Sequence, residues 1–406
     1  MKLETLDILI VKNPPPGHGG RYFIFVILKT ACGIKGVGEV YAATFGPDVV
    51  KAMIEDVFAR YLEGTSPHQI ERFWRRTHGS GFTHRPDLSM QGVVSGLEMA
   101  CWDIIGKAAD RPVYDLLGGK VHDRLRSYTY LYPNDDQDPG SFYSDPVASA
   151  ETAALRVAEG FSAVKFDPAG QYTVYDGRIA DLEAMDRSEN FCKLIREAVG
   201  DKADMLFGTH GQFSAAGAIR MAQRLEKYQP LWFEEPTPPD MPEEMAKVAR
   251  GTTIPVATGE RLCTKFEFGR VIDSGAAAIL QPDLGRVGGI LEAKKIAAMA
   301  EARYIQVAPH LYCGPIVAAA NIQLATMIPN FLIIESIGKM DGFHGQLVKN
   351  QIKWEDGYII PPTVPGLGVE LDEDVARAHP WDGGPLHLEM GAEPFDAKRH
   401  RLFPGG

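Results

Sequence analysis

The sequence predicts an α/β protein in which a parallel (β/α) barrel follows an N-terminal α+β module. Its 406 residues are too many for one ordinary domain and suit a barrel with an added module. Near the start, strand-like runs come first and helical patterns follow, whereas later short apolar runs alternate with helical segments. These changes of pattern divide the chain into residues 1–123, 124–340 and 341–406.

The first region is expected to be the α+β module. Two strand-like apolar runs, Leu3–Val11 and Tyr22–Lys29, flank a loop rich in Pro and Gly at Asn13–Gly20. Helical patterns follow at Gly46–Leu62 and Ser95–Ala109. Strands followed by helices are typical of an α+β arrangement.

The second region shows the pattern of a parallel barrel. Its short apolar runs are Ser127–Leu131, Ala163–Phe166, Met205–Phe207, Leu231–Phe233, Val256–Thr258, Ala278–Leu280, Ile305–Val307 and Leu332–Ile334. Helical segments lie between them, for example Ala215–Lys227, Ile290–Ala302 and Pro315–Met327. A doubly wound open sheet gives a similar alternation, but it usually has fewer strands. No glycine-rich phosphate loop follows any of these runs, so we favour the barrel.

Two further segments bear on the architecture. The connection Pro168–Arg187 is long and rich in Tyr, Asp and Gly, as lids and contact loops commonly are. The third region, 341–406, has little helical period and many Pro and Gly residues. We expect it to wrap back onto the N-terminal module and complete the capping region.

Composition and charge exclude several classes of function. The net charge is −11 and no basic stretch could neutralise phosphates, so no nucleic-acid partner is expected. No segment approaches the roughly 20 apolar residues that span a bilayer, so no membrane partner is expected. The five cysteines are scattered without a paired or zinc-binding spacing, which is typical of reduced thiols in a cytoplasmic protein. An anionic substrate stays compatible, because a bound cation can invert the local field.

Ionisable residues stand at the ends of successive predicted strands. In a parallel barrel these ends converge on one mouth. The residues, in chain order, are Lys165, Asp167, His210, Glu234, Glu260, Asp283, His310 and Glu335. One such residue could be an ordinary helix cap, but an ionisable group at seven consecutive strand ends indicates a functional site.

The residue types at these positions suggest a chemistry. Glu234 and Glu260 come from neighbouring strands and can share a hard cation such as Mg2+ through their carboxylate oxygens. Such an ion can hold a substrate carboxylate and stabilise the enediolate formed when the α-proton leaves. Asp283 can orient the imidazole of His310 and raise its basicity, which makes His310 the candidate general base.

The motifs at these residues resemble the mandelate racemase/muconate lactonizing enzyme-type members of the enolase superfamily, over essentially the whole chain. The matching segments are Glu98–Lys107, Asp115–Gly119, Phe233–Pro236, Thr258–Arg261, Gln281–Gly289, Ala308–His310 and Pro365–Asp374. The resemblance implies a modified (β/α)7β TIM-type barrel under a capping α+β domain, with one Mg2+ ion as cofactor and Mn2+ as an alternative. It also implies a His310–Asp283 base, a hydrogen bond from Glu335 to the substrate carboxylate, and a homo-oligomer.

Within this family the sugar-acid dehydratases look nearest. They carry a histidine two residues beyond the third-strand metal ligand, where it protonates the departing hydroxyl, and His210 occupies that place. The usual racemase arrangement is Lys-x-Lys on the second strand, whereas this chain has Lys165 and Asp167. We therefore expect a dehydratase that converts an acid sugar, an aldonate or aldarate, to its 2-keto-3-deoxy acid.

The chain departs from the family pattern at one metal ligand. The third-strand ligand is normally an aspartate, and Gly208 stands at that position. Asp167, at the neighbouring strand end, is the preferred replacement. Alternatively, His210 ligates and leaves the acid role unfilled, or Asp167 only caps a turn before Pro168.

Two other functions are compatible with the sequence. An epimerase, racemase or cycloisomerase would use Lys165 as a second base, on the face opposite His310, with its pKa lowered by the nearby cation. A binding protein with a degenerate metal site would explain Gly208, but not the retained His310–Asp283 pair and both glutamates.

Overall fold

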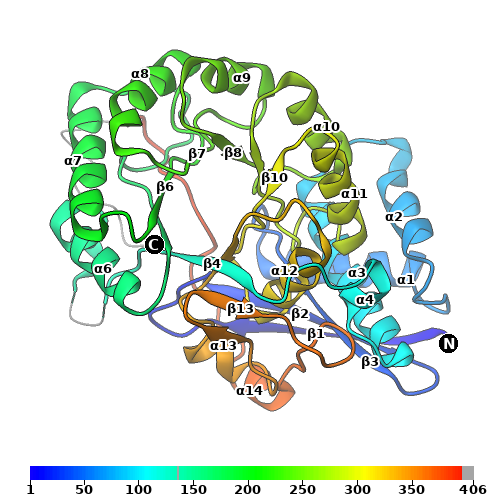
Figure 1. The fold of residues 1–406 in the computed structure, drawn as a ribbon. Coiled ribbons are helices and arrows are strands. Elements are labelled where there is room, and N and C mark those ends of the chain that lie inside the picture. Colours follow the sequence, from blue (N-terminus) through cyan, green and yellow to red (C-terminus); the bar gives the residue numbers. More distant parts are fainter. Residues whose placement is uncertain (135–136, 396–406) are drawn as a thin grey trace.

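The computed structural model describes residues 1–134 and 137–395, and Figure 1 shows its fold. The part of the third region at 396–406 lies outside the described residues. The chain opens with an antiparallel sheet of strands β1 (Leu3–Lys12), β2 (Tyr22–Thr30) and β3 (Lys35–Val40), in that order. The first two strands were predicted and the third was not.

The sequence of β3 has few strand-forming residues because the strand packs very close to the helix that contains Gly96 and Ala100. Its sequence KGVGEV contains two glycines. A β-carbon on Gly36 would lie 2.2 Å from the carbonyl oxygen of Ala100, and one on Gly38 would lie 1.8 Å from that of Gly96. Glycine is therefore required for contact with the helix, although it weakens strand propensity.

Helices of the N-terminal module follow the sheet. They are α1 (Pro47–Tyr61), α2 (Ile70–His78), the 3-10 turn η1 (Ser80–Phe82), α3 (Leu88–Ala109) and α4 (Val113–Leu117). Helix α3 begins seven residues before the predicted Ser95. The Asp87 side chain accepts hydrogen bonds from the backbone N–H groups of Ser89 and Met90 and so caps the helix.

In the part of the barrel that the structure describes, eight parallel strands are joined by seven main helices. The strands are β4 (Leu125–Tyr130), β5 (Ala163–Phe166), β6 (Asp204–Gly208), β7 (Trp232–Glu234), β8 (Val256–Thr258), β9 (Ile279–Leu280), β10 (Gln306–Val307) and β11 (Ile334–Ser336). The connecting helices are α6 (Pro146–Ala158), α7 (Leu182–Val199), α8 (Ala215–Leu225), α9 (Pro242–Gly251), α10 (Thr264–Ser274), α11 (Ile290–Glu301) and α12 (Pro315–Met327), with the short α5 (Pro139–Phe142) and η2 (Glu226–Tyr228) beside them. This confirms the predicted (β/α)7β barrel.

Hydrogen bonds close the strands into a ring. The strands pair in chain order from β4 to β10, and β11 pairs with β4. A parallel bridge between Val307 and Phe331, with a backbone bond from Leu332 to Val307, joins the remaining gap. One buried residue from each strand or its neighbour fills the centre: Tyr128, Ala163, Leu206, Trp232, Ala257, Ile279, Ala308 and Ile333. This layer forms the floor beneath the mouth.

Two buried glutamates of the N-terminal module fasten it to the barrel. Glu39 accepts hydrogen bonds from the backbone N–H groups of Gly314, Ile316 and Val317 at the start of α12. Glu98 does the same for Ile290 and Leu291 at the start of α11. Burial raises the pKa of each carboxyl to about 7 against the opposing effect of these N–H groups.

The C-terminal region contacts the barrel and the N-terminal sheet in turn. It contains α13 (Gly342–Gln346), β12 (Lys353–Glu355), β13 (Tyr358–Ile360) and α14 (Glu373–Ala378). Strand β13 pairs with β4 of the barrel, and α14 packs against β1.

The chain then crosses the mouth of the barrel as a segment of residues 380–391, which we term the strap (Figure 1). Trp381 donates a backbone bond to Ile10, and the ring of His387 accepts one from the N–H of Arg21. Gly391 exchanges backbone bonds with Tyr172 and Val174 of the 168–187 loop. The strap therefore ties that loop to the N-terminal module. In the described ranges, no helix has the length and apolar character needed to cross a bilayer.

Candidate active site

The eight side chains predicted to form the site lie together at the C-terminal ends of the strands. Lys165, Glu234 and Glu335 belong to β5, β7 and β11, and the others follow β5, β6, β8, β9 and β10 within three residues. Seven of the eight residues are buried, and His210 is partly exposed. This convergence follows from the parallel strand order, because all C-terminal strand ends face the same mouth.

His310 and Asp283 form an oriented pair. His310 Nδ1 lies 2.7 Å from Asp283 Oδ2, and Asp283 Oδ1 accepts a bond from the N–H of Gly285 at 2.7 Å. The carboxylate can only accept, so the Nδ1 proton points at Asp283 and Nε2 faces the mouth. Burial disfavours the imidazolium, but Glu260, Asp283 and Glu335 outweigh it and raise the pKa of His310 to about 9.

His210 forms a second aspartate–histidine pair across the mouth. Its Nδ1 lies 2.8 Å from Asp167 Oδ2. Glu260 lies between the two imidazoles, with Oε1 3.5 Å from His210 Nε2 and Oε2 3.2 Å from His310 Nε2. Burial opposes the charged form of His210, whereas Glu260 and Asp167 favour it and raise its pKa to about 9.

Lys165 connects two carboxylates on the other side of the site. Its Nζ donates to Glu234 Oε1 at 2.6 Å and lies 3.8 Å from Glu335 Oε1. Glu335 Oε2 accepts a bond from the N–H of Leu311 at 2.9 Å. Burial alone would lower the pKa of Lys165, but Glu234 and Glu335 hold it well above its usual value.

Several neighbours of the site had no predicted role. Trp232 Nε1 donates to Glu234 Oε2 at 2.9 Å, and Arg261 donates to Glu235 at 2.7 Å. The hydroxyl of Tyr172, in the 168–187 loop, donates to Asp167 Oδ2, and its ring lies 4.6 Å from that of His210. The tyrosine-rich composition of that loop was the only signal for Tyr172, and it did not indicate which tyrosine turns inward.

The donor atoms of the site suit a hard cation. Asp167 Oδ1 and Glu260 Oε2 are buried and have no hydrogen-bond partner, whereas both oxygens of Glu234 are engaged. As the side chains stand, no three His, Cys, Asp or Glu residues within 1–134 and 137–395 are grouped closely enough to enclose a metal ion. Carboxylate oxygens at three strand ends, two of them unpartnered, are nevertheless the donors that Mg2+ prefers.

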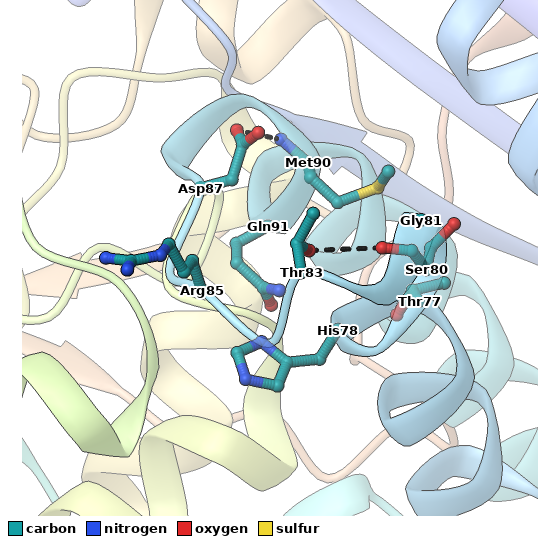
Figure 2. Close-up of a pocket in the computed structure, with 9 residues that line it drawn as sticks. All are labelled: Thr77, His78, Ser80, Gly81, Thr83, Arg85, Asp87, Met90 and Gln91. Atoms are coloured by element: carbon teal, nitrogen blue, oxygen red, sulfur yellow. Dashed lines mark hydrogen bonds between the residues drawn. The ribbon is translucent and has the colours of Figure 1, made fainter.

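A separate pocket lies outside this site, at the N-terminal module. Figure 2 shows its lining, which comes from α2, η1 and the start of α3: Thr77, His78, Ser80, Gly81, Thr83, Arg85, Asp87, Met90 and Gln91. None of the eight predicted residues lines it. We therefore place the candidate chemistry at the barrel mouth.

Comparison with known proteins identifies the family of the chain. Residues 18–118 match the mandelate racemase/muconate lactonizing enzyme N-terminal domain, and residues 148–375 match the enolase C-terminal domain-like family. The chain is 34% identical to a D-xylonate dehydratase of Haloferax volcanii, covering 96% of this chain and 95% of that protein. It is 36% identical to a D-galactonate dehydratase of Ralstonia nicotianae, with 86% and 89% covered.

A solved structure is similar in both fold and sequence. The mandelate racemase/muconate lactonizing enzyme from Sulfitobacter sp. is 57% identical, with a TM-score of 0.95 over 98% of this chain and 100% of that one. Both domain matches fall on the two parts of the fold described above. The chain therefore belongs to the mandelate racemase/muconate lactonizing enzyme family of the enolase superfamily.

Proposed function

We propose that this enzyme is a Mg2+-dependent hydro-lyase that dehydrates an acid sugar, an aldonate or aldarate, to its 2-keto-3-deoxy acid. The observation that carries the proposal is the pair of imidazoles on either side of Glu260, each beside its own aspartate. Elimination of water needs one group to take a proton and another to give one. The xylonate and galactonate dehydratases among the relatives support the substrate class.

The two histidines take different roles in this proposal. His310 Nε2 takes the proton from C2, and the electrons of that C–H bond enter the enediolate. The C3–O bond then breaks as C2=C3 forms, and His210 gives its proton to the departing hydroxyl, which leaves as water. The resulting enol ketonises to the 2-keto-3-deoxy acid. Asp283 holds the Nδ1 proton of His310, so that Nε2 is the atom available to accept from the substrate, and Asp167 and Glu260 favour the protonated form of His210.

Asp167, Glu234 and Glu260 are the residues that would hold the cation. A bound Mg2+ would supply positive charge for the developing enediolate. Lys165 lies between Glu234 and Glu335, where its ammonium adds a fixed positive charge, and Glu335, when it carries a proton, can donate a hydrogen bond to the substrate carboxylate.

A substrate screen tests this function. Acid sugars are incubated with the enzyme and Mg2+, and 2-keto acid is measured for the parent, His310→Asn and His210→Asn. We expect product from one or a few stereoisomers. His310→Asn should lose both product and C2-proton exchange with solvent, whereas His210→Asn should retain exchange and lose product. Parent enzyme that exchanged the C2 proton of substrates and released no keto acid would contradict dehydration and favour epimerisation.

A further inference from the structure

The strand register places Asp167, one of the proposed cation ligands, directly beside Gly208. Strands β5 and β6 pair with Phe166 opposite Phe207, so Asp167 and Gly208 stand side by side at the next position. Gly208 in turn pairs with Glu234 on β7. Asp167, Gly208 and Glu234 thus occupy one level of three adjacent strands, and the middle strand presents no side chain there.

The carboxylate of Asp167 occupies the space that a side chain at 208 would need. A β-carbon built on Gly208 would lie 1.8 Å from Asp167 Oδ1 and 2.8 Å from its Cγ. Real β-carbons do not approach other atoms this closely, so a side chain at 208 would require the Asp167 carboxylate to leave its present position. The backbone conformation at 208 does not require glycine, because the φ of Gly208 lies outside the left-handed region where glycine is favoured.

The two oxygens of Asp167 have different surroundings. Oδ2 accepts from the Tyr172 hydroxyl and faces His210 Nδ1 at 2.8 Å. Oδ1, which points over Gly208, is buried and has no hydrogen-bond partner. A buried carboxylate oxygen without a partner is costly unless a cation or a donor meets it.

From these contacts we infer that Asp167 and Gly208 form a matched pair in which the metal carboxylate has moved from the third strand to the second. Asp167 acts through both oxygens: Oδ1 ligates the cation and Oδ2 positions His210. Gly208 is what leaves room for Oδ1. The inference rests on the metal-dependent function proposed above, but it concerns only where the ion is held.

Reciprocal substitutions test the pair. Mn2+ affinity of the metal-stripped full chain is measured by titration calorimetry, without substrate, for the parent, Asp167→Asn, Gly208→Asp and the exchanged double variant Asp167→Gly/Gly208→Asp. Asp167→Asn should raise the Kd by about tenfold or more, because one anionic ligand is lost. The double variant should bind Mn2+ within a few-fold of the parent, because the carboxylate is restored on the neighbouring strand.

Controls separate loss of the ion from loss of the fold. Asp204→Asn removes a carboxylate from the first residue of β6, the strand that ends at Gly208. Asp204 pairs with Arg126 there, far from the mouth, so this substitution should leave the Mn2+ Kd unchanged. Thermal unfolding reports whether each variant is folded. Gly208→Asp alone should unfold at a lower temperature than the parent, and removal of the opposing carboxylate in the double variant should recover part of that loss.

Two results would overturn the inference. A folded Asp167→Asn enzyme with parental Mn2+ affinity would show that Asp167 only positions His210. A folded double variant as weak as Asp167→Asn would show that position 208 is not the alternative place for the ligand. Because no substrate is present, failure of dehydration in the acid-sugar screen would leave this test unaffected.

Discussion

At the scale of single residues, the tautomer of His310 depends on one hydrogen bond. Asp283 is the partner of Nδ1, and Asp283→Asn would let the side-chain amide face that nitrogen instead. The proton would then move to Nε2, the atom that must accept from substrate. We expect kcat to fall by roughly a hundredfold or more while the Mn2+ Kd stays near the parental value. Parental kcat would show that Asp283 does not orient the base.

The same scale shows which site residues the sequence could predict. All eight predicted side chains converge because strand periodicity places them, and strand order then brings their ends together. Tyr172 and Trp232 were missed for a different reason. Each reaches the site through the path of its own side chain or loop, and neither stands at a predicted strand end.

At the scale of elements, Glu98 couples α3 to α11 in a pH-dependent way. Its pKa is raised to about 7 in the folded protein, against a value near 4.5 when unfolded, so the folded state holds the proton more tightly. Protonation of Glu98 therefore contributes to the free energy of unfolding. This contribution is at its full value below pH 4.5 and is lost as the pH rises through 7. Across pH 5 to 8, the free energy of unfolding of the parent should therefore fall relative to Glu98→Gln, by at most about 3 kcal/mol.

Chemical denaturation at several pH values measures this difference. Glu4→Gln changes an exposed glutamate of β1 and is the matched control, for which the difference from the parent should not vary with pH. A pH-independent difference for Glu98→Gln would mean that the carboxyl of Glu98 titrates alike in the folded and unfolded protein.

The bounds of α12 match the predicted Pro315–Met327, a mostly apolar stretch that is buried along its whole length. Strand β3 was missed because its glycines are needed for close packing against α3. The two elements are far apart in the sequence, so the contact leaves no apolar pattern in the sequence of β3 itself. The first turns of α3 were missed because polar and glycine residues there are buried by tertiary packing.

At the scale of the whole molecule, the strap sets the position of the 168–187 loop. Gly391→Pro removes the N–H that Gly391 donates to Tyr172, so the loop should loosen and Tyr172 should lose its place beside Asp167. We expect KM to rise about tenfold and limited proteolysis to cut the loop faster. Met390→Ala, at a partly exposed neighbour, is the matched control. Unchanged KM and unchanged cleavage in Gly391→Pro would contradict a positioning role for the strap.

The strap also determines when the enzyme becomes complete during its synthesis. A ribosome delivers all eight charged side chains of the mouth well before residues 380–391 emerge. Until then the nascent barrel carries a cluster of ionisable groups open to water, and the loop that holds Tyr172 lacks its backbone bonds to Gly391. Docking of the strap is therefore a late step that joins the N-terminal module to the 168–187 loop, and a translation product arrested after β11 would contain every predicted catalytic residue and still lack a finished site.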